Sequence, residues 1–361
     1  MISNALMIAS AVCLLFSIVP LLPVPHGAVR SFDFARLQVI SLSLIVLAGT
    51  IIFWSSAIPI RISLALAGSA LAIQLVHVVP FTPIWRRQTA RHEGNPDAVT
   101  TISLLVCNVK QSNRDFDSVT RVIERRRPDI VILMETDAAW ATALEPTLSD
   151  FRETVRYPQP NTYGMILASR FALAESAVQF LLNEEVPSIW CRVTLPDGNE
   201  VRVIALHPEP PIPSRDTLGR DAEILLVGKK AREEYLPTIV TGDLNDVAWS
   251  RTTRRFLRIS RLLDPRQGRG LFNSFHAQFW FLRWPLDHIF HSRHFELVSI
   301  ERLPSVGSDH FPMYYRFALT DEARNTPPSP ASKDDIEEAD EAVKAEKARD
   351  RPPVGTDWEK T

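Results

Sequence analysis

The sequence predicts an α/β domain with a mixed β-sheet and helices outside it, preceded by a transmembrane helical unit. Three observations predict this class. Three long apolar runs dominate the first 81 of the 361 residues. From Thr101, patterns of buried strands alternate with helical patterns and later follow one another in hairpins. After Leu319 the composition changes to Pro, Ser, Ala and charged residues, with no aromatic residue until Trp358.

The apolar runs cover residues 5–22, 37–55 and 62–80 and contain no Asp, Glu, Lys or Arg. Each approaches the roughly 20 residues that a helix needs to cross a bilayer. A signal peptide is the alternative for the first run, but no basic segment precedes it and two further runs follow. We therefore predict three transmembrane helices within residues 1–81 and a multi-pass membrane protein.

The arginines around these runs are unevenly distributed. Arg61 stands alone between the second and third runs, and five others fall in the segments that share the opposite side: Arg30, Arg36, Arg86, Arg87 and Arg91. The positive-inside rule therefore favours the cytoplasm for the C-terminal part, although long domains cross membranes largely regardless of charge. Residues 82–100 are polar and punctuated by prolines, which predicts a linker.

Residues 101–319 form the predicted domain. The segments ISLLVCNVK and DIVILME are typical of buried strands, and an amphipathic helix over 117–127 separates them. Strands are also predicted at TYGMILASRF, VPSIWCRVTLP and VRVIALHP, the last two joined by an Asp197-Gly198 hairpin turn. A helix over 214–235, the strand PTIVTGD, a helix over 249–259 and the strands DHIFHS, FELVSIERL and HFPMYYRFA complete it.

The tail, 320–361, is predicted to be disordered and acidic, because it holds too little apolar surface to offset the entropy of ordering. The net charge of -2 combines +3 over residues 1–100 with -5 over this tail, since acidic and basic residues are equal in number over 101–319. The domain thus lacks the general basic field of proteins that bind many nucleic-acid phosphates. Cys13, Cys107 and Cys191 have neither a disulfide framework nor zinc spacing, which leaves the redox compartment open.

Polar residues stand at the ends of the predicted strands, where solvent or a ligand would meet them. They are Asn108, Glu135, His207, Asp243, Asn245, Asp287, Asp309 and His310. Singly, each has a structural explanation, such as a strand cap or a satisfied histidine. Their recurrence at one strand end after another indicates a common site, because open α/β sheets place their chemistry at the carboxyl ends of strands.

The residue types suit hydrolysis of phosphate esters. Glu135 and Asp309 are hard oxygen ligands of the kind that Mg²⁺ prefers. A pair of Asp287 and His310 would supply a base whose tautomer the carboxylate fixes. Asn108, His207 and Asn245 would then meet the charge that develops on phosphoryl oxygens.

Taken in order, these segments resemble the motifs of the endonuclease/exonuclease/phosphatase superfamily. The segments that carry the resemblance are NVK, DIVILMET, YGMILASR, ALHPEP, GDLNDVAWS, PLDHIFHS and GSDHFP, which cover about residues 101–319. The short hydrophobic N-terminal unit and the segment WSRTTRRFLRISRLLDPRQGRG are similar to a membrane-anchored bacterial subgroup, which implies a bacterial inner membrane as the location.

The resemblance implies a four-layered α/β/β/α sandwich with a divalent-metal site, for Mg²⁺ or Mn²⁺, at one rim. It implies Glu135 and Asp309 as metal ligands with Asn108 close to the metal, and His310 as the base oriented by Asp287. Asp243 and Asn245 would position water and stabilise the transition state. His207 would contact the scissile phosphate.

The sequence departs from the superfamily at several places. Asp246 stands where a small residue commonly follows the GD-x-N core, and no glutamate that supports His207 is assigned, with Glu184, Glu185 and Tyr163 as candidates. The segment 271–284 is unusually aromatic. Its aromatic residues are predicted to stack on bases, to enter a bilayer interface or to pack as a core flap.

The functional hypothesis is a membrane-anchored phosphodiesterase that depends on a divalent metal. Nuclease-like activity is favoured because the arginine-rich helix would place Arg251 and Arg255 on a phosphate backbone. A phospholipase-like or sphingomyelinase-like activity on a lipid headgroup is the alternative, and a non-catalytic membrane binding protein of the same fold is the second. No protein partner is inferred.

Overall fold

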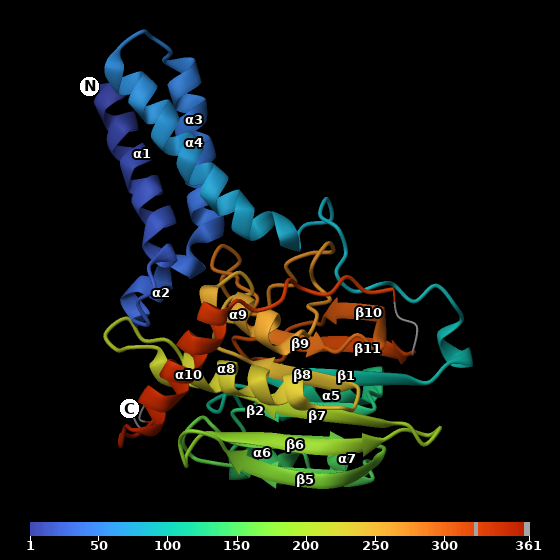
Figure 1. Ribbon diagram of the computed structural model, residues 1–361. Helices are drawn as coiled ribbons and strands as arrows, with labels where there is room; N and C mark the ends of the chain where they lie inside the picture. The colour runs from blue at the N-terminus through green and yellow to red at the C-terminus, as the bar shows by residue number, and fades with distance from the viewer. Residues whose placement is uncertain (321–323, 357–361) are drawn as a thin grey trace.

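The computed structural model describes residues 1–320 and 324–356, and the remaining positions, including Trp358, lie outside the described residues. A bundle of helices projects from a larger domain that contains two stacked β-sheets (Figure 1). The last described helix lies against the domain, far from the tip of the bundle.

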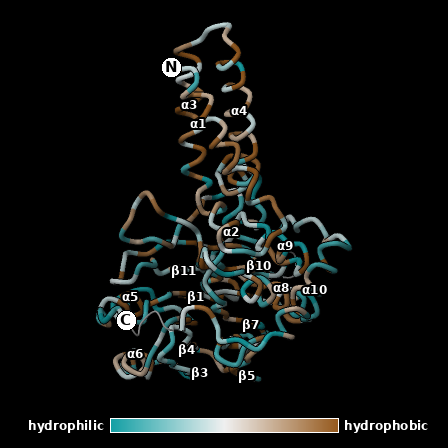
Figure 2. The backbone as a smooth tube through the Cα atoms, turned by 90° about the vertical axis from the view of Figure 1, so that its left-hand side faces the viewer, coloured by the Kyte–Doolittle hydropathy of each residue, from teal (hydrophilic) through white to brown (hydrophobic). Residues whose placement is uncertain are grey.

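The bundle consists of α1 (Ile2–Ile18), α3 (Arg36–Ile52) and α4 (Ile58–Val78), with the short α2 (Gly27–Phe34) at the domain end. Two helical segments, Ile2–Leu21 and Ile58–Phe81, are long and apolar enough to cross a membrane. The third predicted span corresponds to α3, which is bent by 61° against α2, so that this pair qualifies only as a broken span. The tube is largely brown along the bundle in Figure 2, as expected for helices that turn apolar side chains outward.

The two sheets give the domain its layers. The six-stranded sheet has the order β10-β11-β1-β2-β4-β3, with β10 (Phe295–Arg302), β11 (Met313–Leu319), β1 (Thr101–Asn108), β2 (Ile130–Met134), β4 (Met165–Ser169) and β3 (Glu153–Tyr157). The five-stranded sheet has the order β5-β6-β7-β8-β9, with β5 (Ala172–Phe180), β6 (Pro187–Thr194), β7 (Glu200–Leu206), β8 (Thr238–Asp243) and β9 (Asp287–His291).

The main core lies between the sheets, where alternate residues of the central strands meet, such as Ile102, Leu104 and Val106 of β1. A second cluster packs α5 (Phe116–Arg126), α6 (Ala138–Ala143) and α7 (Glu145–Leu148) on the outer face of the six-stranded sheet. A third packs α8 (Leu218–Glu233) and α9 (Arg251–Ser260) on the other sheet. The order of layers is therefore α/β/β/α, and the predicted fold class is confirmed.

The predicted elements of the domain recur within a few residues of their expected ends. The Asp197-Gly198 turn joins β6 to β7, with Gly198 at a φ of 86° and its N–H donating to Leu195 O at 2.9 Å. The sequence missed β3 and β5, which lie at the edges of the two sheets. Their side chains are half-buried or exposed, so neither strand has a continuous apolar pattern.

The expectation of a disordered tail is wrong for residues 333–347, and positions 321–323 and 357–361 of the tail lie outside the described residues. Residues 333–347 form α10 (Lys333–Lys347), which begins with a capping box between Ser332 and Asp335 and packs against α8 and α9. Arginines of α9 bind its carboxylates: Arg258 reaches Asp335 at 2.7 Å and Arg251 reaches Glu338 at 2.8 Å. Ion pairs, rather than buried apolar area, thus order a segment whose hydrophobicity is low.

Candidate active site

The site is built where strand ends from both sheets meet. Parallel pairing places Asn108, at the end of β1, beside Met134, and Glu135 follows directly. In the second sheet antiparallel pairing sets Asp243, at the end of β8, opposite Asp287, at the start of β9. The side chain of Asn108 joins the two sheets, since its Nδ2 donates to Glu135 Oε1 at 2.7 Å and to Asp243 Oδ2 at 3.0 Å.

Asn108 is oriented as a donor toward the carboxylates. Its Oδ1 accepts the backbone N–H of Lys110 at 2.9 Å, which fixes the amide and leaves Nδ2 against Glu135. The geometry therefore differs from the expected metal ligand, because the amide oxygen points to the backbone and not to Glu135. Glu135 also accepts from Gln111 N at 3.2 Å, and burial raises the pKa of Glu135.

His310 stands between two carboxylates. Its Nδ1 lies 2.7 Å from Asp287 Oδ2 and its Nε2 lies 3.4 Å from Asp243 Oδ2. Burial alone would lower the pKa of His310, but the charges of Asp287 and Asp243 outweigh burial and raise it to about 10. Burial raises the pKa of Asp243, so these neighbours hold a proton tightly between them.

His207 and Asn245 line the same cavity from the other side. His207 Nε2 lies 3.9 Å from Asp243 Oδ2, and its buried Nδ1 has no hydrogen-bond partner among the described residues. Burial lowers the pKa of His207 to about 4, so this imidazole is neutral at pH 7. Asn245 adopts a φ of 52°, and its Nδ2 donates to Pro208 O at 2.9 Å.

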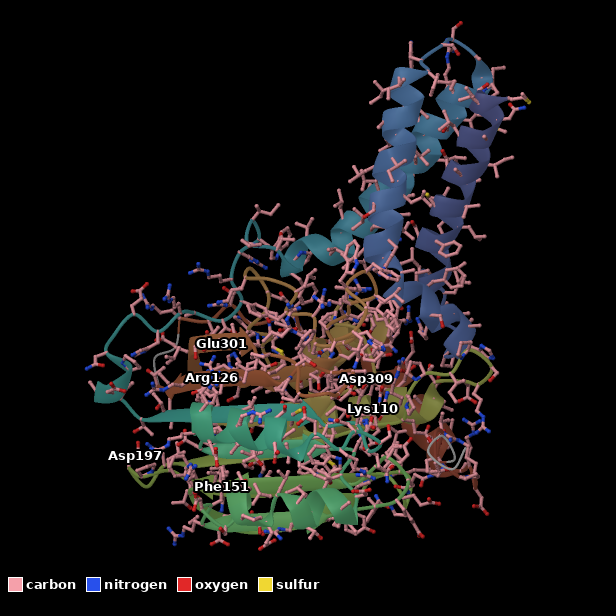
Figure 3. The ribbon with its side chains drawn as sticks, turned by 180° about the vertical axis from the view of Figure 1, so that it is seen from behind. Lys110, Arg126, Phe151, Asp197, Glu301 and Asp309 are labelled. Atoms are coloured by element: carbon pink, nitrogen blue, oxygen red, sulfur yellow. The ribbon has the colours of Figure 1, made fainter. Side chains whose placement is uncertain are left out.

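These side chains surround a cavity of about 410 Å³, which Glu135, Asp243, Asn245, His207, Asp309 and His310 all line. Lys110 also lines it and reaches Asp309 Oδ2 with its Nζ at 3.2 Å. Figure 3 labels Lys110 and Asp309 close together on the side of the domain near the bundle. The structure thus brings the expected catalytic and metal-binding residues to one cavity, with Asp287 behind His310.

Arg251 and Arg255, expected to bind substrate, are not part of this site. Arg251 Nη2 donates to Glu338 at 2.8 Å, and Arg255 contacts both Glu338 and Asp335 of α10. Neither lines the cavity. The sequence misplaced them because the helix that binds them was expected to be disordered.

Several wall residues had escaped the sequence analysis. Lys110 follows a strand end in the NVK segment and has a φ of 59°, a backbone signal that sequence alone does not give. Phe34 comes from α2, well before Lys110 and the other wall residues in the sequence, and Phe275 comes from the aromatic segment 271–284. Phe275 packs on His310 with ring centroids 4.9 Å apart.

The structure also shows where the residues lie at which the sequence departs from the superfamily pattern. Of the candidates to support His207, Tyr163 lies nearest, with ring centroids 5.7 Å apart, whereas the Glu185 carboxylate accepts from Asn161. Asp246 points away from the cavity, toward Thr253 at 3.1 Å and Arg220 at 3.5 Å. It therefore anchors α9 and does not add charge to the cavity wall.

The donor set fits a hard divalent cation. Glu135 and Asp309 present carboxylate oxygens to the cavity, and the described part of the chain brings no cysteine there. Asp243, Asp287 and His310 also form a group whose ligand atoms lie within 4.8 Å of one another. Both sets already have partners in the protein, since His310 is paired with Asp243 and Asp287 and Lys110 is paired with Asp309, so either set could hold the cation.

The two facing sheets, the strand-end carboxylates and the Asp-His pair define the class of phosphate-ester hydrolases with an α/β/β/α sandwich. The sequence profile of the Endonuclease/Exonuclease/phosphatase family matches residues 105–310. The chain belongs to this family, and it is an enzyme of the class that hydrolyses phosphate esters.

Solved structures agree in fold. The endonuclease/exonuclease/phosphatase from Bacteroides vulgatus is 16% identical, with 61% of this chain and 99% of that chain covered and a TM-score of 0.51. The human Nocturnin catalytic domain with bound sulfate is 19% identical over 64% of this chain and 98% of that chain, with a TM-score of 0.50. A humanized D. rerio TDP2 is 15% identical over 61% and 99%, also with a TM-score of 0.50. No curated protein sequence matches the chain.

Proposed function

We propose that this chain is a membrane-anchored phosphodiesterase that depends on a divalent metal and uses His310 to activate water. The observation that supports it is the arrangement of His310 between Asp287 and Asp243 in a cavity that also contains Glu135 and Asp309. A bound Mg²⁺ or Mn²⁺, held by Glu135 and Asp309, would supply positive charge for the phosphoryl oxygens.

The protein's own groups manage the proton. His310 Nδ1 donates to Asp287, which fixes the tautomer and directs Nε2 into the cavity. The raised pKa of His310 means that Nε2 is protonated at neutral pH while the cavity holds only its own charges. A cation held by Glu135 and Asp309 would offset the charge of the carboxylates around His310, and His310 Nε2 is the atom that would then take the proton of water.

Three groups are placed to meet the phosphate oxygens. Lys110 supplies a cation at the cavity wall, Asn245 supplies an amide, and neutral His207 supplies an imidazole. These donors stabilise the negative charge of the transition state more than that of the substrate if they face the equatorial oxygens. Asn108 does not contact the phosphate in this scheme. It orients the carboxylate of Glu135 by donating a hydrogen bond to it.

The residues of the cavity wall bear on the choice between the two candidate substrate classes. Nuclease-like activity, which the arginines of α9 favoured, loses that support because Arg251 and Arg255 bind α10. Phe34 of the helical unit, Phe275 and Leu286 make part of the wall apolar and place it next to the bundle. This favours the second candidate, an amphiphilic phosphodiester such as a lipid headgroup, over a nucleic acid.

The chain is proposed to sit in the membrane as a multi-pass protein with the catalytic domain on the cytoplasmic side. The support is the apolar length of α1 and α4 and the excess of arginine at the domain end of the bundle. A non-catalytic binding role on the same fold is disfavoured, since the residues of the expected machinery converge on one cavity.

The test is hydrolysis by the full chain in detergent micelles, with and without Mg²⁺, on single-stranded DNA, duplex DNA, RNA, sphingomyelin and phosphatidylinositol phosphates. We expect activity that EDTA removes and that His310→Ala lowers by about 100-fold or more, measured at a temperature at which circular dichroism shows that the variant is folded. Full activity of His310→Ala would refute its role as the base. Activity on nucleic acid alone would restore the nuclease hypothesis, and inactivity on every substrate would favour the binding protein.

A further inference from the structure

A second cavity, which we call the junction pocket, lies where α4 meets α9. Its volume is about 270 Å³. Its apolar wall includes Val76, Phe81 and Trp85, and its cationic wall consists of Arg86, Arg254 and Arg258. It shares no lining residue with the cavity around Glu135.

The arginines of this pocket differ in whether a carboxylate neutralises their charge. Arg258 is paired with Asp335 at 2.7 Å. Arg254 is half-buried and donates from its Nε only to Ser250 O, at 3.3 Å. Among residues 1–320 and 324–356 no carboxylate lies within ion-pair distance of Arg254, and the nearby Asp33 is bound by Arg36 at 2.6 Å. The pocket therefore contains a partly desolvated positive charge without a counter-charge.

The excess of positive charge extends along the same junction. Arg86, Arg87 and Arg91 have no ion pair within the part of the chain that the structure describes. Arg269, which donates to the carbonyls of Pro265 and Thr89, is half-buried beside them. Burial, followed by repulsion from Arg87 and Arg91, lowers the pKa of Arg269 to about 10. An anion placed here would relieve this repulsion.

The pocket opens at the level where α4 leaves the apolar part of the bundle. Val76, on the last turns of α4, is 69% exposed, and Ile84 and Trp85 just after it are 84% and 44% exposed. Tryptophan and arginine beside a membrane span are typical of the headgroup level. In Figure 1, α9 lies at the face of the domain that meets the base of the bundle, so the pocket has one wall from each part.

We propose that the junction pocket binds the phosphate headgroup of an anionic phospholipid, with Arg254 and Arg86 as the cations and the acyl chains along the exposed face of α4. Two guanidinium groups match the phosphate oxygens, and Trp85 and Val76 lie beside the glycerol and acyl regions. The bound lipid supplies the counter-charge that Arg254 lacks. The proposal requires α4 to cross a membrane, but it does not require the site at Glu135 to be catalytic.

The experiment uses the full chain purified in a neutral detergent. Its melting temperature is followed by tryptophan fluorescence as phosphatidylglycerol or phosphatidylcholine is added, and bound lipid is counted by native mass spectrometry. We expect phosphatidylglycerol to raise the melting temperature and phosphatidylcholine to leave it unchanged. The double variant Arg86→Gln/Arg254→Gln should weaken phosphatidylglycerol binding at least about tenfold.

Two further variants serve as controls. Arg152→Gln changes an exposed arginine between α7 and β3, next to Phe151, which Figure 3 labels on the side of the domain away from the bundle, and this variant should bind like the wild type. Arg86→Gln alone changes an exposed residue and should lose part of the affinity even if the double variant does not fold. Without lipid, the double variant should melt at or above the wild-type temperature, because it lacks an unpaired, partly desolvated charge.

Three results would overturn the proposal. Equal stabilisation by inorganic phosphate or glycerol phosphate would assign the pocket to a soluble anion. Undiminished phosphatidylglycerol binding by the double variant would place the lipid elsewhere. A double variant that melts lower by the same amount with and without phosphatidylglycerol would show that the arginines only stabilise the fold.

Discussion

At the scale of single residues, Asp287 tests the proton-handling scheme most directly. It is 1% exposed, and its only described side-chain partner is His310, through Oδ2. Asp287→Asn keeps the shape but presents an amide that no longer stabilises imidazolium. We expect kcat to fall by about 100-fold or more with little change in KM. Asp117→Asn, at an exposed position of α5, is the control, and a loss that appears mainly in KM would contradict the role of Asp287.

A buried carboxyl away from the site controls how stability depends on pH. Glu223 is 4% exposed and its Oε1 has no partner among the described atoms. Burial, with a contribution from Glu209, raises the pKa of Glu223 from 4.5 to about 8. The folded protein therefore keeps a proton that the unfolded chain has lost between these values, and the free energy of unfolding falls as pH rises through this window.

Glu223→Gln removes this titration. Relative to the wild type, the variant should gain about 1 kcal/mol for each pH unit as the pH rises from 5.5 to 7.5. Thermal melting of both proteins in detergent across that range measures the difference. For Glu124→Gln, at an exposed position of α5, the melting temperature should change with pH as it does in the wild type. If the melting temperature of Glu223→Gln also changes with pH as in the wild type, then Glu223 is ionised in the folded protein.

The sequence indicated the cavity residues well but not all of their orientations. Glu135, Asp243 and His310 line the cavity and Asn108 contacts two of its carboxylates; all four were identifiable because each lies at or within three residues of the end of a strand with a clear apolar pattern. The direction of the Asn108 amide depends on the backbone of Lys110, and a sequence pattern does not contain this information. Phe34 was beyond prediction, because its place in the wall depends on how the bundle docks.

At the scale of elements, α10 shows that a low apolar content does not by itself predict disorder. Its apolar content predicted disorder, yet its N-terminal turn places Asp335 against two arginines of α9. Because α10 was not predicted, Arg251 and Arg255 were expected to be free to bind substrate. A helix stabilised by specific ion pairs is recognised only when the partner surface is known, whereas an apolar strand is visible in its own sequence.

Asp335 gives the matching prediction. It accepts from Arg255 and Arg258 and from the backbone of Ser332, and its side chain is 9% exposed. Asp335→Asn removes the charge that both guanidinium groups need, and should lower the free energy of unfolding by about 2 kcal/mol. The neighbouring Asp334→Asn changes an exposed carboxylate with the same net charge difference. Equal melting temperatures for the two variants would show that the ion pairs do not hold α10.

At the scale of the whole molecule, the bundle and the domain share a core. Val78 and Phe81 pack with Val247, Ala248, Trp249 and Leu286, and Phe34, Leu37 and Ile40 complete this cluster. Trp249 is fully buried and its Nε1 donates to Asp33 O at 2.8 Å. Trp284 likewise donates to Phe34 O and packs on its ring, at 5.4 Å between centroids. Residues of the helical unit thus form part of the domain face that contains the candidate active site.

This shared core predicts that the domain does not keep its stability when the helical unit is removed. A chain that begins at residue 82 would expose Trp249 and Leu286, both nearly inaccessible in the full protein. The lost burial should lower the melting temperature by more than about 5 °C relative to the full chain in the same detergent. As a control, a full chain with Leu44→Ala changes a side chain on α3 that is 52% exposed and outside this cluster, and should melt close to the wild type.

Kinetic measurements distinguish a helical unit that only tethers the enzyme from one that also completes the cavity wall. If the helical unit only tethers the enzyme, the chain from residue 82 should keep its kcat on a soluble phosphodiester at temperatures well below its melting point. Because Phe34 forms part of the cavity wall and Trp284 and Phe275 are packed beneath it, we expect instead that KM rises even where the domain remains folded. An unchanged melting temperature together with an unchanged KM would show that the domain is complete without the bundle, and the apolar wall would then have to be explained by the domain alone.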